Sequence, residues 1–150
     1  MDTSVMEGWV VLETRTFRIP SLPPSMNAIY QIIFHLKQVQ MKPEVRAWKT
    51  QAKQMIPAMT PHADSYIFKL DAHFHYDWLF KNKAFRKFDT ANMLKVLIDS
   101  VAEKVGIKDE YVKAGSWDTT HSPDKEFVDC TLTQLAWAKG DSGKEGKNGS

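Results

Sequence analysis

The side chains best suited to chemistry lie in two short stretches, one at the start of an expected helix and one in the loop after it. They are Asp89, Asn92, Lys95, Asp99, Asp109 and Glu110. Magnesium prefers hard oxygen ligands and usually takes one or two carboxylates together with water and substrate phosphate. Acids, an amide and a lysine in this arrangement therefore indicate a divalent metal that acts on a phosphate ester.

The expected helix arranges its polar groups on one side. At about 100° per residue, Asn92, Lys95 and Asp99 share one stripe of a helix predicted over residues 90–105. Asp89 caps the N-terminus of this helix, and Gly106 ends it. The apolar residues on the opposite side are Leu94, Leu97, Ile98, Val101 and Val105. The polar stripe is therefore available to a ligand.

Carboxylates from the helix start and from the following loop are predicted to share one magnesium ion, with Asp89, Asp109 and Glu110 as ligands. Lys95 would hold the scissile phosphate or offset the charge that develops in its transition state. Each residue also has an ordinary explanation, because Asp is a preferred N-cap and Lys95 with Asp99 forms a common i,i+4 pair. The loop acids likewise fit a solvated turn. The residues alone leave both interpretations open.

A basic and aromatic segment, residues 76–88, leads directly into Asp89. Its cations are Lys81, Lys83, Arg86 and Lys87, and five aromatic residues are interleaved with them. Such cations bind DNA phosphates by displacing counterions, and exposed rings stack on unpaired bases or wedge into a branch point. Alternatively, the rings pack into the core or a dimer interface while the charges face water. Both interpretations can hold at once, each for different residues of the segment.

The composition indicates one globular domain. The chain has 150 residues, of which 43% are hydrophobic and 25% charged, and its net charge of +2 selects no partner by itself. Cys130 is the single cysteine, which excludes an internal disulfide and fits a reducing compartment. The sequence has no secretory signal and no run of roughly 20 apolar residues that would span a membrane. We therefore expect a cytoplasmic protein without a membrane segment.

The periodicity of the hydrophobic residues predicts an α/β (α+β) fold with a small sheet and two main helices. Strands are expected over residues 9–19, 65–76, 111–118 and 126–137, and helices over 43–57 and 90–105. Within the second strand, alternate residues from Tyr66 to Tyr76 should face the core. The domain is expected to span residues 1–137, followed by a glycine-rich, disordered tail over 138–150.

Several other residues are expected to be structural. The first helix should bury Val45, Trp48, Ala52 and Met55, while Arg46, Lys49 and Lys53 form a solvated face or a secondary phosphate contact. His73 and His75 share a strand face, but magnesium prefers oxygen and no third histidine has a suggestive spacing. Cys130 should be a buried, inert thiol. None of these residues is therefore assigned a central chemical role.

Two motifs resemble the RusA family of Holliday-junction resolvases. One is Asp-x-x-Asn-x-x-Lys-x-x-x-Asp over residues 89–99, and the other is Gly-Ile-Lys-Asp-Glu-Tyr-Val over residues 106–112. The sequence Pro-Pro-Ser-Met-Asn over residues 23–27 is similar to that family's early Pro-Pro-Ser-x-Asn. The resemblance covers residues 9–137. It implies a mixed four-stranded sheet and a homodimeric, magnesium-dependent endonuclease, with Mn²⁺ as a possible substitute, that cuts four-way DNA junctions in a bacterial or phage-infected cytoplasm.

By position, the resemblance implies magnesium ligands at Asp89, Asp109 and Glu110, a catalytic lysine at Lys95, and supporting roles for Asn92 and Asp99, the latter as a further ligand. Asn27, Asn92 and the cations of residues 76–88 are the implied DNA contacts.

The sequence departs from the family pattern at two positions. Ala91 stands where many members have a second acid, and Glu110 stands where Asp is common. Asp99 or a main-chain carbonyl can compensate for the missing acid. Two alternatives therefore stand beside the resolvase: a junction-binding protein with weakened or lost cleavage, and a metal-dependent nuclease for flaps or single strands.

Overall fold

A computed structural model of the chain describes residues 7–24, 30–33, 38–62, 65–86 and 90–138. In chain order the elements are β1 (Trp9–Ile19), β2 (Tyr30–Ile33), β3 (Gln38–Met41), α1 (Pro43–Met55), β4 (Tyr66–Tyr76), α2 (Thr90–Val105), the short 3-10 helix η2 (Asp109–Tyr111), β5 (Val112–His121) and β6 (Phe127–Trp137). Four strands form one sheet in the order β1-β6-β4-β5, and β2 and β3 form a separate two-stranded sheet.

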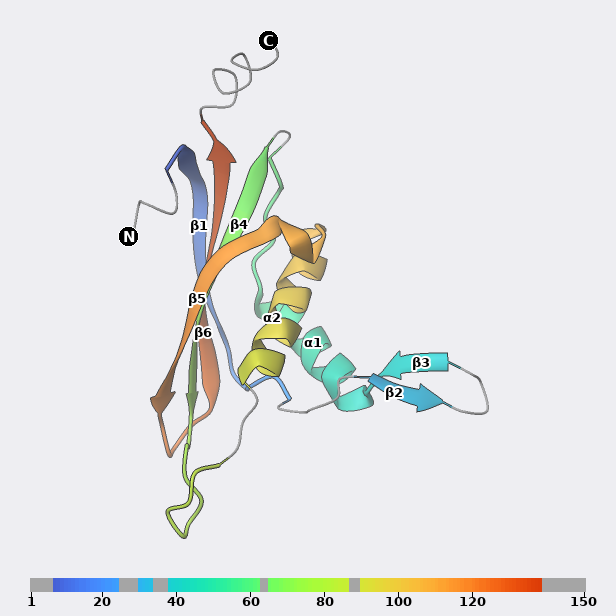
Figure 1. The fold of residues 1–150 in the computed structure, drawn as a ribbon, viewed down its shortest axis with the longest axis vertical. Helices are drawn as coiled ribbons and strands as arrows, with labels where there is room; N and C mark the ends of the chain where they lie inside the picture. The colour runs from blue at the N-terminus through green and yellow to red at the C-terminus, as the bar shows by residue number, and fades with distance from the viewer. Residues whose placement is uncertain (1–6, 25–29, 34–37, 63–64, 87–89, 139–150) are drawn as a thin grey trace.

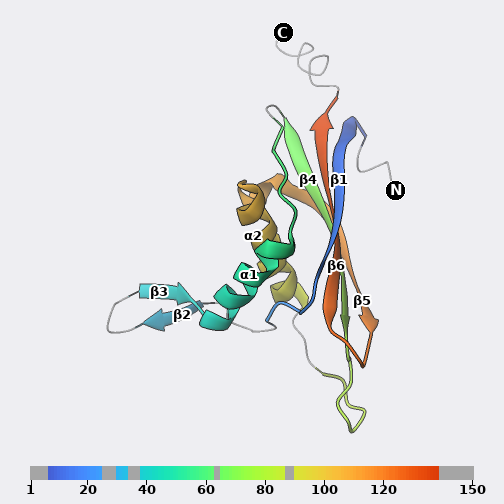
Figure 2. The ribbon, with the colours of Figure 1, turned by 180° about the vertical axis from the view of Figure 1, so that it is seen from behind.

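The main sheet is mixed, because β5 runs parallel to β4 while the other neighbouring strands are antiparallel. The parallel pair requires a crossover, which α2 supplies. Both helices lie on the same side of the sheet (Figures 1 and 2). The predicted small α+β fold with a mixed four-stranded sheet is thus confirmed.

Strand β4 carries the alternation that the sequence predicts. Phe68, Leu70 and Phe74 are buried toward the helices, whereas Lys69 and His73 on the other face are half-buried. The first half of strand β6 follows the same rule, with Val128, Cys130 and Leu132 in the core, whereas Leu132 to Leu135 are buried without alternation. Residues that alternate in this way fix the register, because a slip by one position would move every apolar side chain to the wrong face.

Helix α2 matches the predicted bounds but buries a wider face. Leu97 and Val101 are fully buried as expected, while Leu94 and Ile98 are only partly buried at the margin. Met93 and Val96, which the single-stripe prediction omitted, are fully buried. The reason is that α2 packs against both the sheet and α1, so its apolar stripe must cover two partners.

Helix α1 buries Val45, Trp48 and Ala52 as predicted, but Met55 is 43% exposed. The helix ends at Met55, and the next residue, Ile56, turns into the core in its place. Lys49 is only 6% exposed, so the prediction of a solvated face is wrong at this position.

Strands β2 and β3 were not predicted. Their four residues each are shorter than the windows in which periodicity is informative. They form a small sheet that projects from the α1 side of the body (Figure 1). Within the described residues, no helix is long and apolar enough to cross a bilayer. The predicted tail falls on residues 138–150, of which only Ala138 is among the described residues.

Candidate functional site

Asp99 is the centre of a charged cluster on α2. Burial raises the pKa of the Asp99 carboxyl above its ordinary value, the ammonium groups of Lys95 and Lys49 oppose the rise, and the negative charges of Asp109 and Glu103 add to it. Lys95 lies one helical turn before Asp99, as the stripe predicts. Asp99 thus lies within electrostatic range of both Lys95 and Asp109, which come from different elements.

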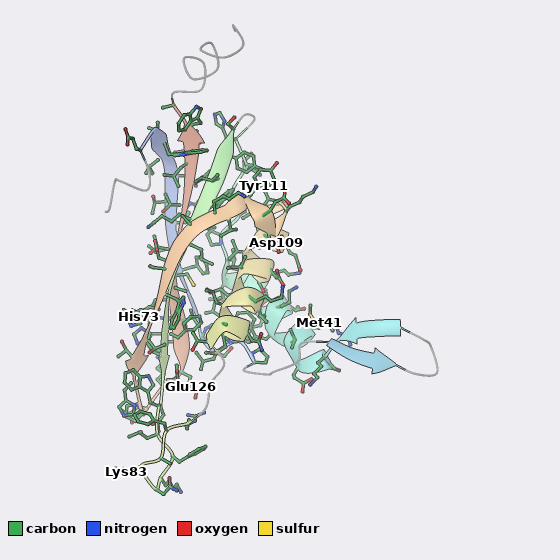
Figure 3. The ribbon with its side chains drawn as sticks, in the orientation of Figure 1. Met41, His73, Lys83, Asp109, Tyr111 and Glu126 are labelled. Atoms are coloured by element: carbon green, nitrogen blue, oxygen red, sulfur yellow. The ribbon has the colours of Figure 1, made fainter. Side chains whose placement is uncertain are left out.

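The turn that carries Asp109 is anchored on both sides. Gly106, with a φ of 87°, ends α2, and the backbone N–H groups of Gly106 and Ile107 donate to the carbonyl of Ala102 over 2.8 and 3.0 Å. After the turn, the Tyr111 ring stacks on Tyr66 of β4, with ring centroids 4.8 Å apart. Figure 3 shows Asp109 and Tyr111 near the end of α2. These contacts hold η2, and with it Asp109, at the C-terminal end of α2.

The start of α2 and the turn lie at opposite ends of the helix (Figure 1). Helix α2 has 16 residues and, at 1.5 Å per residue, spans about 24 Å. Asp89 lies outside the described residues, so its role as a ligand stays a prediction. Its covalent neighbour Thr90 begins α2, far from η2.

Asp99 on α2 and Asp109 in η2 are two predicted ligands among the described residues, and the negative charge of Asp109 acts on the half-buried Asp99 carboxyl. Carboxylate oxygens are donors that Mg²⁺ or Mn²⁺ accepts along with water and phosphate oxygens. Within the described ranges, no three acids, histidines or cysteines form a group that could hold a metal alone. Glu110 follows Asp109 in η2 and is exposed.

Two further predicted residues lie on α2. Asn92 is half-buried near the start of the helix. Ala91, at the position where the family often has an acid, is exposed one residue earlier. The polar stripe thus runs along α2 toward the charged cluster.

Lys49 and Glu103 belong to this cluster and were not predicted. Lys49 forms an ion pair with one carboxylate oxygen of Glu103, and Lys53 forms a second pair with the other oxygen at 2.5 Å. In sequence, Lys49 and Lys53 repeat at four residues, as do Asp99 and Glu103. That spacing marks facing stripes on two helices, but only the packing of α1 on α2 shows that the stripes meet.

The segment after β4 forms a projecting tip loop, residues 79–85, beyond the end of the sheet (Figure 1). Leu79 and Phe85 form a β-bridge, and the backbone N–H of Phe80 donates to the carbonyl of Ala84 over 2.8 Å. Lys83 closes the turn with a φ of 70° and a backbone bond to the carbonyl of Phe80. The loop therefore has a defined conformation.

The tip loop presents both rings and cations to solvent. Phe80 is 55% and Phe85 71% exposed, and Lys81 and Lys83 are exposed beside them. Phe80, Lys81 and Lys83 line a groove of about 630 Å³ that continues to His121 and Pro123. Phe80 and Phe85 are therefore exposed rings, and their contact with DNA stays a prediction.

Arg86 and Trp78 serve the base of the tip loop instead. The Arg86 guanidinium donates to the carbonyl of Asp77 over 3.0 Å and pairs with Glu126 at 3.4 Å. Trp78 is partly buried against the core. Predicted DNA contacts at Lys87 and Asn27 lie outside the described residues.

The face of the sheet without helices holds a second polar groove, of about 530 Å³. Arg18 donates to both carboxylate oxygens of Asp129, at 2.6 and 3.0 Å, and holds the pKa of Asp129 below its ordinary value. His73 and His75 stack with centroids 4.4 Å apart, and burial and the neighbouring His73 lower the pKa of His75. Cys130 is buried, as predicted, and this burial raises the pKa of its thiol to about 12.

No protein-family model and no curated protein sequence matches the chain. Any function must therefore be inferred from the residues and from their arrangement.

Proposed function

We propose that this protein is a magnesium-dependent endonuclease that cuts branched DNA, chiefly four-way junctions, as a homodimer in the cytoplasm of a bacterium or of a phage-infected cell. The observation that carries the proposal is the cluster of Lys95, Asp99 and Asp109. It combines two carboxylates with a lysine, and magnesium-assisted phosphodiester hydrolysis uses groups of these kinds. The order of the motifs that resemble RusA agrees with it.

Each group of the cluster has a distinct task. A bound magnesium ion would supply an acidified water and neutralise phosphate charge. Asp99 and Asp109 would hold that ion through their carboxylate oxygens. The exposed ammonium of Lys95, one turn from Asp99, binds a phosphate oxygen and offsets the negative charge that grows during cleavage. No covalent bond between protein and DNA is needed.

The homodimer follows from the symmetry of the substrate. A four-way junction is resolved by two paired nicks, and a two-fold dimer supplies two matched sites. Asp89 remains a candidate ligand in this proposal, together with Glu110.

The primary test is cleavage of labelled junctions with and without magnesium. Paired nicks that require the metal are expected for a four-way junction, and slower cutting is expected for flaps and single strands. Faster cutting of flaps or single strands than of junctions would replace the resolvase with a structure-specific nuclease of another kind. The absence of nicks with tight binding would favour the junction-binding protein.

Ala91 motivates that junction-binding alternative. An Ala91→Asp variant adds an exposed carboxylate near the start of α2 without disturbing the core. If the parent binds junctions but cuts them poorly, this variant is expected to raise the cleavage rate about tenfold or more. A parent that cuts well and an Ala91→Asp variant that cuts no faster would show that the missing acid is not limiting.

The tip loop is expected to recognise the branch point. Replacing Phe85 by Ser should weaken junction binding about tenfold, because stacking on one unpaired base contributes about 1–3 kcal/mol. Binding to an unbranched duplex of the same length should change little. Fluorescence anisotropy with both DNAs measures the difference. Trp117→Ser is the matched control, since Trp117 is an exposed ring (52%) on β5, outside the tip loop.

The cations of the tip loop should act on both DNAs alike. Lys81→Gln and Lys83→Asn should each reduce the slope of log K against log salt by about one. Asn is chosen at position 83 because it tolerates the positive φ found there. An unchanged slope for both variants would show that the tip loop does not contact phosphates.

A further inference from the structure

Lys49 is a buried lysine in a protein with one hydrophobic core. Its side chain is only 8% exposed, and its neighbours on α1 include the fully buried Val45 and Ala52. Removing an ammonium group from water costs several kcal/mol unless a partner compensates. The partner is Glu103 of α2, which forms an ion pair with it. Such an arrangement calls for a reason beyond packing.

Glu103 does not need Lys49 to be satisfied. Its second carboxylate oxygen pairs with Lys53 at 2.5 Å, and its side chain is 45% exposed to water. Burial raises the pKa of the Glu103 carboxyl, but the hydrogen bonds from Lys49 and Lys53 lower it further, so the pKa lies below its ordinary value. Replacing Lys49 with an apolar residue of similar size would therefore leave no buried charge unpaired. Such replacements are often neutral or stabilising.

The charge of Lys49 also reaches the candidate metal site. Glu103 lies one helical turn after Asp99 on the same stripe of α2, so the ammonium that it holds stands beside Asp99. The electrostatic interactions of Asp99 include Lys49 as well as Lys95. Lys53, which is 36% exposed, is not among them. Of the two lysines on α1, Lys49 is therefore the one that acts on the site.

We propose that Lys49 is a positioning residue of the metal site: held by Glu103 one helical turn from Asp99, its buried ammonium is the counter-charge that orients Asp99 in the metal-free protein, and it limits how tightly a divalent cation binds. The inference rests on the proposed metal site. A buried positive charge repels an incoming cation. Its removal leaves a more negative site that holds the cation more tightly but orients Asp99 less well.

The direction of this effect separates it from structural damage. A loosened fold would weaken cation binding, whereas loss of a competing ammonium would strengthen it. The test measures Mn²⁺ binding to the full chain by electron paramagnetic resonance of the free ion, without DNA. Lys49→Met is expected to bind Mn²⁺ roughly three- to tenfold more tightly than the parent. Lys53→Met should bind within about twofold of the parent, and Lys49→Arg should behave as the parent does.

Thermal unfolding checks the fold of each variant, and Lys49→Gln replaces Lys49→Met if the latter does not fold. If the Lys49 variant binds Mn²⁺ no more tightly than the parent does, the inference is wrong but the metal site is not. The Asp99→Asn variant is expected to bind no Mn²⁺ at millimolar concentration. If the parent also binds none, both the inference and the metal site are wrong. If Lys53→Met increases the Mn²⁺ affinity as much as Lys49→Met does, the effect is one of overall charge, and the inference is wrong.

Discussion

Asp109→Asn is expected to reduce the rate of junction cleavage by at least about 100-fold while the protein still binds the junction. The substitution keeps the size of the side chain and removes one of the two carboxylates that are coupled in the cluster. Loss of a direct metal ligand should exceed the roughly 10- to 100-fold cost of losing a residue that only supports a ligand. Because Asp109 is exposed, the fold should be unaffected.

Binding and cleavage must be measured separately in this experiment. Removal of a negative charge near a DNA phosphate should leave affinity unchanged or raise it slightly, so the loss belongs to the chemical step. Asp118→Asn is the control, because Asp118 is an exposed acid on β5 with a side chain 71% exposed and lies on the face without helices. If Asp109→Asn and Asp118→Asn cut equally fast, Asp109 is not a metal ligand and the proposed site is wrong.

The elements that the sequence predicted well are those with one dominant hydrophobic period. Strand β4 alternates over its whole length, so its buried face and its bounds both followed from the pattern. Helix α2 had a cap position, a regular stripe and Gly106 as a stop, and its bounds agree with the structure. Strands β2 and β3 lack such signals because each is only four residues long.

The candidate site was predicted only in part, because a sequence gives neighbours along one element and not between elements. The stripe of Lys95 and Asp99 follows from helical spacing alone. The place of Asp109 depends on where the turn after α2 leaves the helix, and it lies at the C-terminal end of α2. The position of Lys49 beside Glu103 depends on how α1 packs against α2. The spacing of residues within either helix does not specify this packing.

The same limit applied to the segment after β4. Its composition predicted cations and rings near DNA but could not separate solvent-exposed residues from anchoring ones. The structure makes that division: Phe80 and Phe85 are exposed, whereas Arg86 is held by Asp77 and Glu126. A substitution of Arg86 would therefore change both the stability of the loop and its binding to DNA. For this reason the tests of the tip loop use Phe85, Lys81 and Lys83.

Gly115→Ala is expected to be the most destabilising of the alanine substitutions at the described glycines, Gly8, Gly106 and Gly115, costing about 3 kcal/mol or more. A Cβ added there would lie 1.9 Å from the carbonyl oxygen of Leu70, and backbone atoms of a central strand cannot move aside as a flexible side chain would. The φ of 150° adds strain for any residue with a side chain. Strand β5 would have to separate from β4 at this point.

Gly106→Ala is the matched control for this substitution. Gly106 also has a positive φ, of 87°, but nothing lies within 4 Å of an added Cβ. The Gly106→Ala substitution should therefore lower the free energy of unfolding only by the strain of a left-handed residue, about 1–2 kcal/mol. Urea unfolding of both variants gives the comparison, and a similar cost for the two would show that β5 does not approach β4 as closely as described. Because β5 starts directly after η2, Gly115→Ala should also impair cleavage in the fraction that remains folded, by loosening the turn that holds Asp109.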